Sequence, residues 1–434
     1  MKPQPNSIQS RMITEASDPL VLVDGVRTPF SRMGTDLAEL SVGELGRTAV
    51  TGLLARTGLN PAHIDECIIG CVGQPADEAN VARIIALRSG IPESVPAMTV
   101  HRNCASGLES LLVAHQRLAA GQGKVFIVGG AESMSGYPMI FRRRAAEKFA
   151  ALASARTVGK RIGRMAAFRP TDFAPLIALR MGLTDPVIGM SMGETAELLA
   201  REFVISREAQ DTFAARSHAL ALAADHTKEI VPVLNEGKAI EADNGARTDS
   251  TIDRLGKLRS VFAKGGDKAH GTVTAGNSSQ LTDGAVALLA MAESKARQLG
   301  FEPIARLDHY AATGCAPKRM GLGPATAIRK TLESARLQLS DIDHLEINEA
   351  FAAQVLAVVS QLKTDGVGEV DLDRLNPNGG SIALGHPVGA SGARLVLTAL
   401  RQLERTGGRR AIVSLCVGGG QGVAALLNRT EPKG

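Results

Sequence analysis

Ala105-Ser106-Gly107 recurs near the end of the chain as Ala390-Ser391-Gly392. A helical pattern follows each copy, and the interval from Gly107 to Ile127 has the same length as the interval from Gly392 to Ile412. Both intervals end in a short apolar run of the kind that forms a buried strand. The chain therefore contains one α/β unit twice.

The repeat extends upstream of the tripeptide. Residues 59–65 resemble residues 339–343, and each segment leads into a strand pattern, at 67–70 and at 345–347. Two related α/β halves normally pack as layers about a pseudo-twofold axis. The sequence thus predicts an α/β fold built by duplication, with an inserted region that begins near residue 138 and has no counterpart in the other half.

Composition fits a layered soluble fold. The chain has 434 residues, enough for two or three domains, and 44% of them are hydrophobic. Only 3% are aromatic, none is Trp, and 46 are Gly, so small aliphatic residues must fill close-packed helix-on-sheet layers. A net charge of +5 does not indicate nucleic-acid binding.

Cysteine usage favours a reducing compartment. The five cysteines are odd in number and lack the spacing of a disulfide framework. Residues 1–17 are polar rather than signal-like, and we expect a cytoplasmic protein without a membrane span. His63, Cys67 and Cys71 are spaced by fours, but a strand at 67–70 would scatter them over two faces, so no metal site is predicted. Cys315 receives no role.

Cys104 is the candidate nucleophile. It precedes an amphipathic helix expected at about 105–120, where the helix N-terminus favours thiolate. The matching position of the second half is Gly389, so only one half carries the thiol. The alternative is a buried structural cysteine.

Two further segments carry chemistry. His386 lies in a turn between Gly385 and Pro387 and is a candidate general base, although a lone histidine is more often structural. Cys416 follows a strand pattern and precedes Gly418, where bare backbone N–H groups can face an oxyanion. The alternative for Cys416 is an ordinary strand-end cysteine.

These motifs resemble the thiolase family in type and order, from about residue 21 to residue 427. The motifs are Asn-Cys-Ala-Ser-Gly at 103–107, Asn-Glu-Ala-Phe at 348–351, Gly-His-Pro at 385–387 and Cys-Val-Gly-Gly-Gly-Gln-Gly at 416–422. The resemblance implies a layered αβαβα duplication with an inserted loop domain. The expected boundaries are 18–137 with 282–301 for the N-terminal half, 138–281 for the insertion and 302–434 for the C-terminal half.

The resemblance also implies the reaction. The chain is expected to cleave 3-ketoacyl-CoA with CoA, through an acyl-Cys104 intermediate, into acetyl-CoA and a shortened acyl-CoA, as in fatty-acid β-oxidation, with no cofactor beyond its CoA substrates. His386 is implied as the base, Cys416 as the acid at the acetyl α-carbon, and Gly418 as an oxyanion donor. Asn348 is implied to hold a water at a second oxyanion site.

Substrate contacts are carried over in the same way. Met192 and Ser279 match substrate-contacting positions, Ser279 beside the pantetheine arm of CoA. Compact biosynthetic thiolases have His where this chain has Ser191, which favours acyl chains longer than acetoacetyl. A homodimer or homotetramer is expected.

Three alternatives stay open. The first is a biosynthetic acetyl-CoA acetyltransferase that makes acetoacetyl-CoA. A ketoacyl synthase is disfavoured because such enzymes lack a second thiol like Cys416. A non-catalytic CoA- or lipid-binding homologue is disfavoured because Cys104, Asn348, His386 and Cys416 are all present.

The basic segment 141–169 resembles the thiolase subunit of multienzyme fatty-acid oxidation complexes, although Asn348 departs from that subgroup. Arginines and lysines alternate there with apolar residues, with Glu147 almost alone in opposition. The segment is either a solvated helix face or a docking surface for phosphates, for an acidic partner such as a hydratase–dehydrogenase subunit, or for a membrane.

Overall fold

A single mixed sheet runs through the protein. The computed structural model describes residues 18–263 and 271–430, and the sheet order is β12-β13-β14-β11-β1-β10-β5-β3-β4, with the short β2 paired to β10. The strands are β1 (Leu20–Arg27), β2 (Ser31–Arg32), β3 (Glu66–Gly70), β4 (Ala97–Val100), β5 (Val125–Ser133), β10 (Thr282–Ala292), β11 (Ala305–Gly314), β12 (His344–Ile347), β13 (Arg410–Val417) and β14 (Gln421–Arg429).

The strand order repeats. β1-β10-β5-β3 in the first half matches β11-β14-β13-β12 in the second. In each half the second strand is antiparallel to both neighbours, whereas β5 with β3 and β13 with β12 are parallel. The halves join through a short antiparallel pairing of β1 with β11. The predicted α/β duplication is therefore confirmed.

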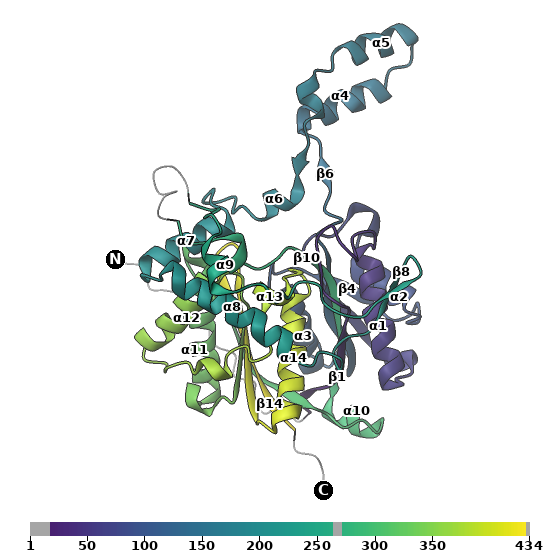
Figure 1. Ribbon diagram of the computed structural model, residues 1–434. Helices are drawn as coiled ribbons and strands as arrows, with labels where there is room; N and C mark the ends of the chain where they lie inside the picture. Colours follow the sequence, from purple (N-terminus) through teal and green to yellow (C-terminus); the bar gives the residue numbers. More distant parts are fainter. Residues whose placement is uncertain (1–17, 264–270, 431–434) are drawn as a thin grey trace, which may run out of the picture.

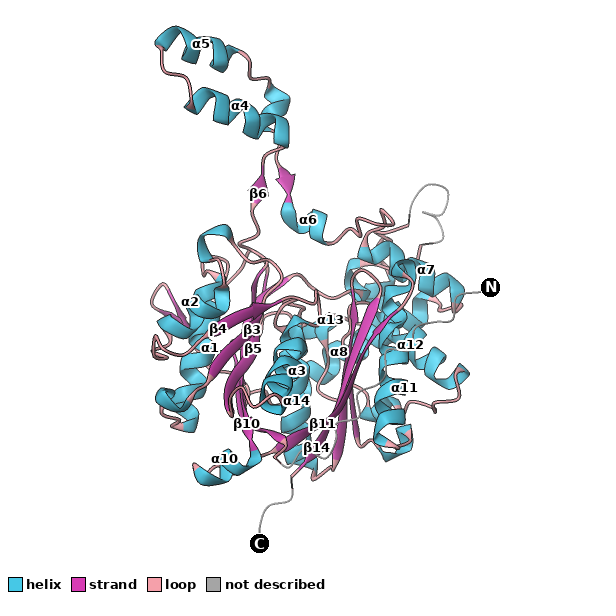
Figure 2. Cartoon of the chain, turned by 180° about the vertical axis from the view of Figure 1, so that it is seen from behind, coloured by secondary structure: helices cyan, strands magenta, loops and turns pink. Residues whose placement is uncertain are grey.

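Helices complete five layers (Figures 1 and 2). α1 (Val42–Thr57) and α2 (Val81–Arg88) cover the outer face of the first half, and α11 (Gly323–Ala335) and α12 (Ala352–Thr364) cover that of the second. α3 (Ser106–Ala119) and α14 (Ser391–Thr406) lie between the two halves of the sheet. The apolar side chains of these two helices, with those of the strands on either side, form the largest core cluster.

The repeated glycines explain how α3 and α14 meet. A Cβ atom on Gly107 would lie 2.8 Å from the backbone nitrogen of Ala393, and one on Gly392 would lie 2.4 Å from that of Leu108. Neither space admits a side chain, so glycine at both positions lets the two helices approach backbone to backbone.

The insertion between β5 and β10 has two parts. α7 (Met192–Glu202), α8 (Arg207–Ala223), α9 (Ile252–Gly256) and the pair β8 (Val233–Asn235) and β9 (Lys238–Ile240) return to the body. β6 (Met139–Ile140), α4 (Arg143–Ala153), α5 (Val158–Ala166) and β7 (Leu176–Ile177) form a helical hairpin, residues 139–177, that projects from it (Figures 1 and 2). The predicted domain boundaries stay predictions.

Short elements link these parts. They are α6 (Ala178–Gly182), α10 (Glu293–Gln298), α13 (Ser381–Leu384) and the 3₁₀ turns Pro61–His63, Ala76–Glu78, Pro170–Phe173, Ala275–Asn277, Pro317–Leu322, Leu339–Asp341 and Leu372–Arg374. Within the described residues, no helix combines the length and apolar character needed to cross a bilayer.

A buried ionic cluster holds the insertion to the first half. The fully buried guanidinium of Arg27 donates to Glu229 at 2.8 Å and to Asp243 at 2.6 Å. Asp243 also accepts the backbone N–H of Phe30 at 2.7 Å. Each buried charge is therefore paired, as its desolvation requires.

Candidate active site

Cys104 lies in the turn that leads from β4 into α3. α3 begins at Ser106, as expected from the sequence. Asn103 adopts a left-handed conformation with φ of 43°, and its carbonyl accepts the Ser106 hydroxyl at 2.7 Å. The Ser106 hydroxyl in turn accepts the backbone N–H of Arg102 at 2.9 Å. These bonds fix the thiol at the N-terminal end of the helix.

The turn after β13 meets this thiol. Cys416 is buried near the end of β13, and the Asn103 amide donates to the Gly418 carbonyl at 2.8 Å. The backbone N–H of Gly418 is hydrogen-bonded to the Cys104 thiol. Burial, followed by the nearby Cys104 and Cys315, raises the pKa of Cys416 well above its usual value. Three of the predicted residues thus come together from distant segments.

His386 follows α13, after Gly385, which has φ of 100°. The backbone N–H of His386 donates to Gln280 O at 3.0 Å, and its Nδ1 lies 2.6 Å from the Ser391 hydroxyl. The other ring nitrogen, Nε2, is buried and has no partner in the part of the chain that the structure describes.

Asn348 directly follows β12. Its side-chain oxygen accepts the Ser381 hydroxyl at 2.7 Å, while its Nδ2, like His386 Nε2, is buried without a partner among the described residues. Buried polar atoms are nearly always hydrogen-bonded, so an unpaired one calls for an explanation, and a ligand is one. Both atoms belong to residues that the sequence assigned to catalysis.

Burial sets the resting charge of the site. It raises the pKa of the Cys104 thiol, against hydrogen bonds from backbone N–H groups that lower it. Burial and these hydrogen bonds act in opposite directions, and the net shift favours a neutral thiol in the resting state. Burial, with Arg394 second, also lowers the pKa of His386 to about 3. The site therefore holds a neutral thiol at Cys104 and a neutral imidazole at His386.

An apolar cavity of about 610 Å³ opens beside Cys104. On one side its walls come from the body, through Val72, Met134, Tyr137 and Val388; on the other they come from α6 and the segment after it, through Leu179, Met181, Leu183, Val187 and Met192. We call this space the apolar cavity. Its shape and lining suit a flexible aliphatic group.

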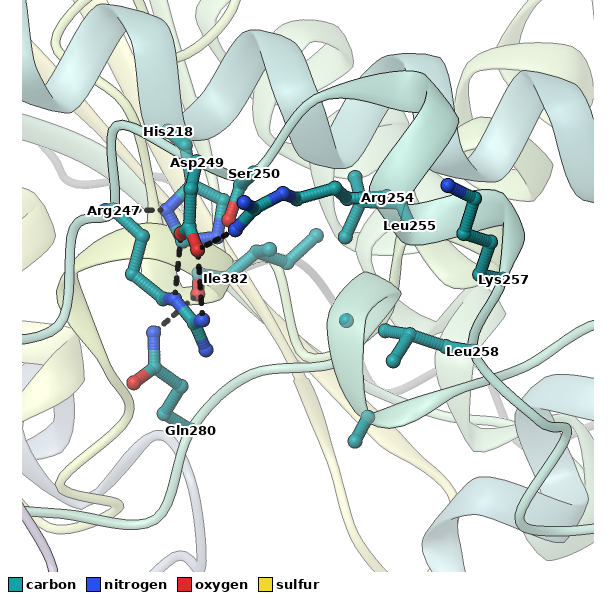
Figure 3. A pocket seen from close by; sticks show the side chains of 12 residues that line it. His218, Arg247, Asp249, Ser250, Arg254, Leu255, Lys257, Leu258, Gln280 and Ile382 are labelled. Atoms are coloured by element: carbon teal, nitrogen blue, oxygen red, sulfur yellow. Dashed lines mark hydrogen bonds and ion pairs between the residues drawn. The ribbon is translucent and has the colours of Figure 1, made fainter.

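A second cavity of about 400 Å³ lies in the insertion (Figure 3). Arg247 and Arg254 both pair with Asp249, and Lys257 lines the same space. We call it the cationic cavity. Gln280 lines it too, and the carbonyl of Gln280 accepts the His386 N–H, so Gln280 connects this cavity to the turn that holds His386.

Sequence reasoning missed the cationic cavity. Arg247, Arg254 and Lys257 stand within one short stretch, but Asp249 and Asp253 among them leave that stretch a net charge of only +1. Only the fold shows that three cations and the segment containing Gln280 share one space.

The remaining predicted residues are placed as follows. Met192 lines the apolar cavity. Ser279 is half-buried, and its N–H donates to Ala350 O at 3.0 Å. Ser191 caps α7, and its hydroxyl donates to Glu194 at 2.8 Å. Cys67 is buried, which raises its pKa to about 12, and Cys71 is buried as well.

A half-buried thiol, a neutral imidazole, a second buried thiol and an unpaired Asn348 amide, on a five-layer duplicated frame, are groups that acyl transfer through a covalent thioester requires. Residues 20–294 match the family model "Thiolase, N-terminal domain", and residues 301–429 match "Thiolase, C-terminal domain". The chain belongs to the thiolase family and is an acyltransferase.

Relatives cover nearly the whole chain. A Staphylococcus aureus (strain COL) protein named "Probable acetyl-CoA acyltransferase" is 40% identical over 422 residues, which are 94% of this chain and 99% of the relative. The crystal structure of the Bacillus anthracis acetyl-CoA acetyltransferase has a TM-score of 0.85 at 36% identity, covering 95% of this chain and 99% of its own. Human mitochondrial 3-ketoacyl-CoA thiolase in complex with CoA has a TM-score of 0.84 at 35% identity, covering 95% and 98%.

Proposed function

We propose that the enzyme cleaves 3-ketoacyl-CoA with CoA into acetyl-CoA and an acyl-CoA two carbons shorter, in fatty-acid β-oxidation. The apolar cavity beside Cys104 carries this proposal, because a cleavage that served only acetoacetyl-CoA would not need about 610 Å³ of apolar space. Hydrophobic pockets discriminate by the apolar surface that they bury, so such a space favours longer chains.

The first half-reaction uses the neutral pair. His386 Nε2 takes the proton of Cys104 as the sulfur attacks the 3-keto carbon, and the oxyanion is stabilised by hydrogen-bond donors. The C2–C3 bond then breaks, leaving the acyl group on Cys104 and the enolate of acetyl-CoA. Cys416, whose pKa burial raises, delivers its proton to the enolate carbon. The Gly418 N–H and a water held by Asn348 stabilise the oxyanions, each donor contributing about 3 kcal/mol.

The second half-reaction releases the acyl group. The proton that His386 took from Cys104 first returns to the Cys416 thiolate, so that His386 is neutral again. His386 then accepts the proton of an incoming CoA thiol, and the CoA sulfur attacks the acyl-Cys104 carbonyl. The Cys104–acyl bond breaks, and the departing Cys104 sulfur takes the proton from His386, which restores the thiol. Run in reverse, the same groups perform Claisen condensation, which is the alternative function of a biosynthetic acetyl-CoA acetyltransferase; the similarity to the Bacillus anthracis enzyme supports it.

The cationic cavity is the proposed site for the nucleotide end of CoA. The cationic cavity supplies Arg247, Arg254 and Lys257 for the phosphates of the nucleotide end, and Ser279 stands on the segment leading to His386. The reaction needs no cofactor besides CoA. We further propose a homodimer or homotetramer in the cytoplasm, where the five free cysteines stay reduced.

Initial rates of CoA-dependent cleavage across 3-ketoacyl-CoA substrates of increasing chain length test this function. We expect kcat/KM to rise beyond the four-carbon substrate and an acyl adduct to appear on Cys104 by mass spectrometry. Cys104→Ala should lack both the turnover and the adduct. A preference for acetoacetyl-CoA would instead support the biosynthetic alternative.

A further inference from the structure

The helical hairpin carries an unusual share of the protein's charge. Residues 139–177 contain nine Lys and Arg residues and two Asp and Glu residues, a net +7. The whole chain has 49 basic and 44 acidic residues, so 40 and 42 remain outside the hairpin, a net −2. All of the protein's positive excess is therefore carried on one projection.

Both acids of the hairpin are already paired. Asp172 is buried and accepts Lys148 at 2.5 Å, and Glu147 accepts Arg143 at 3.0 Å. No ion pair within the described residues engages the cations of α5 or the arginines beside it; these are Arg142, Arg156, Lys160, Arg161, Arg164 and Arg169. They form an exposed cationic surface.

An apolar stripe lies along the same helix. Val158, Ile162 and Met165 recur at helical spacing on one side of α5 and are 75%, 62% and 62% exposed. α5 has no buried residue, so this stripe is not a core face. Lys160, Arg161 and Arg164 fall on the remaining sides of the helix.

The hairpin holds this surface on a preformed support. The rings of Phe141, Phe149, Phe168 and Phe173 pack together with centroids 4.9 to 6.2 Å apart. None of these four residues is buried; Phe141 and Phe173 are about half exposed and Phe149 somewhat less. The hairpin thus carries exposed aromatic, aliphatic and cationic side chains, and it projects away from the body (Figure 1).

We propose that the helical hairpin docks the enzyme on an anionic phospholipid surface, with the α5 stripe entering the interface and the surrounding cations contacting headgroup phosphates. An amphipathic helix with basic residues beside an exposed apolar stripe is the combination that binds at such an interface. Each basic residue near the surface strengthens binding about fivefold. The inference does not depend on which acyl chains the enzyme cleaves.

A second copy of this chain fits the hairpin poorly. Two hairpins brought together would oppose +7 to +7, and the rest of each chain offers only −2. A bilayer containing anionic lipid supplies both the negative charge and the apolar depth that the surface lacks.

Co-sedimentation of the full-length enzyme with vesicles tests the proposal. We expect binding to phosphatidylcholine vesicles that contain phosphatidylglycerol, and at least tenfold weaker binding to pure phosphatidylcholine, at an ionic strength of about 0.15 M. Ile162→Ser with Met165→Ser should weaken binding to the anionic vesicles at least tenfold. Lys160→Glu with Arg164→Glu should weaken it at least about twentyfold.

Matched controls use the body of the protein. Leu234→Ser removes an exposed apolar side chain from β8, and Lys238→Glu with Arg409→Glu makes the same charge change away from the hairpin. These variants should bind vesicles as the wild type does, and all variants should keep thiolase activity. Equal binding by hairpin and control variants, or no binding to anionic vesicles, would overturn the proposal. The proposal would also be overturned if Ile162→Ser with Met165→Ser lowered the molecular mass of the enzyme in the absence of lipid, because the stripe would then be a contact between copies. It would be overturned too if those substitutions left vesicle binding intact but abolished binding to a hydratase–dehydrogenase subunit.

Discussion

The Nδ1 atom of His386 lies 2.6 Å from the hydroxyl oxygen of Ser391, and that hydroxyl lies 3.0 Å from the carbonyl of Pro387. A carbonyl only accepts, so the Ser391 hydroxyl donates to Pro387 and accepts from Nδ1–H. The proton of the neutral imidazole is thereby placed on Nδ1. Nε2 is left with a free lone pair, which is the form a general base requires.

Ser391→Ala should lower kcat about tenfold with little change in KM, because the imidazole loses the partner that fixes its tautomer and ring orientation. Steady-state kinetics measure this split. Ser110→Ala removes a buried hydroxyl from α3 outside the site and is the control. Equal kcat in Ser391→Ala and the wild type would show that the tautomer is set elsewhere.

Cys416→Ala should separate the two half-reactions. Without the acid, carbon–carbon cleavage should fall at least about a hundredfold, the lower range for a positioned acid. Transfer of an acyl group from one CoA to another needs only Cys104 and His386 and should persist. Radiolabelled CoA exchange measures the transfer. Parallel loss of both activities would contradict a role confined to the enolate.

Leu179→Trp should shorten the accepted chain, because Leu179 lines the apolar cavity and an indole would fill part of it. kcat/KM for long substrates should fall at least about tenfold, the scale of one or two lost methylene contacts, while the four-carbon substrate is unaffected. Leu234→Trp on the exposed β8 controls for the added ring. A uniform loss at every chain length would place the acyl chain outside this cavity.

Glu132 holds the halves together beside the site. Its buried carboxylate accepts the N–H groups of Val72, Gly73 and Gly389 at 2.7 to 3.0 Å. Glu132→Ala leaves three buried donors unpaired and should lower the free energy of unfolding by about 4 kcal/mol. Urea unfolding measures it, and Glu132→Gln, which keeps the acceptor oxygen, should lose less. Equal stability of the alanine variant and the wild type would refute the role.

Acid should destabilise the enzyme through His386. Its folded pKa of about 3 lies below the ordinary value of 6.5, so the unfolded chain binds the proton first as pH falls. The contribution is complete above pH 6.5 and is lost toward pH 3. Between pH 6.5 and about 5 the loss should be roughly 2 kcal/mol. Urea unfolding at several pH values should therefore show a shallower dependence for His386→Asn, and an unchanged slope would contradict the burial argument.

Much of this could be predicted from the sequence because the repeat is local. Gly107 and Gly392 stand at equivalent places in two copies, and a repeated pattern of helix and strand specifies the layers without long-range information. The thiols and His386 stand out by their glycine-rich surroundings. Ser391 could not be assigned a role, because it is identical in sequence to its counterpart Ser106. Only the structure shows that Ser106 bonds to Asn103 whereas Ser391 bonds to His386.

The α5 stripe and the cationic cavity depend on where their segments lie in the fold, which the hydrophobic periodicity of the sequence does not specify. The pattern of α5 predicts an amphipathic helix, and such a stripe ordinarily faces a core. In the fold it faces outward, because β6 and β7 lift the hairpin away from the layers. The cations of the cationic cavity were not recognised from the sequence, because acidic residues lie between them along the chain.

Gly107 contacts α14 and Gly392 contacts α3, so the backbone of each half limits which residue the other half can carry at this contact. A side chain added at either glycine would displace the opposite backbone, so both positions require glycine. Cys104 and His386 stand a few residues before the two glycines. The two candidate catalytic residues, which differ between the copies, therefore stand beside a symmetric helix contact that neither copy can change alone.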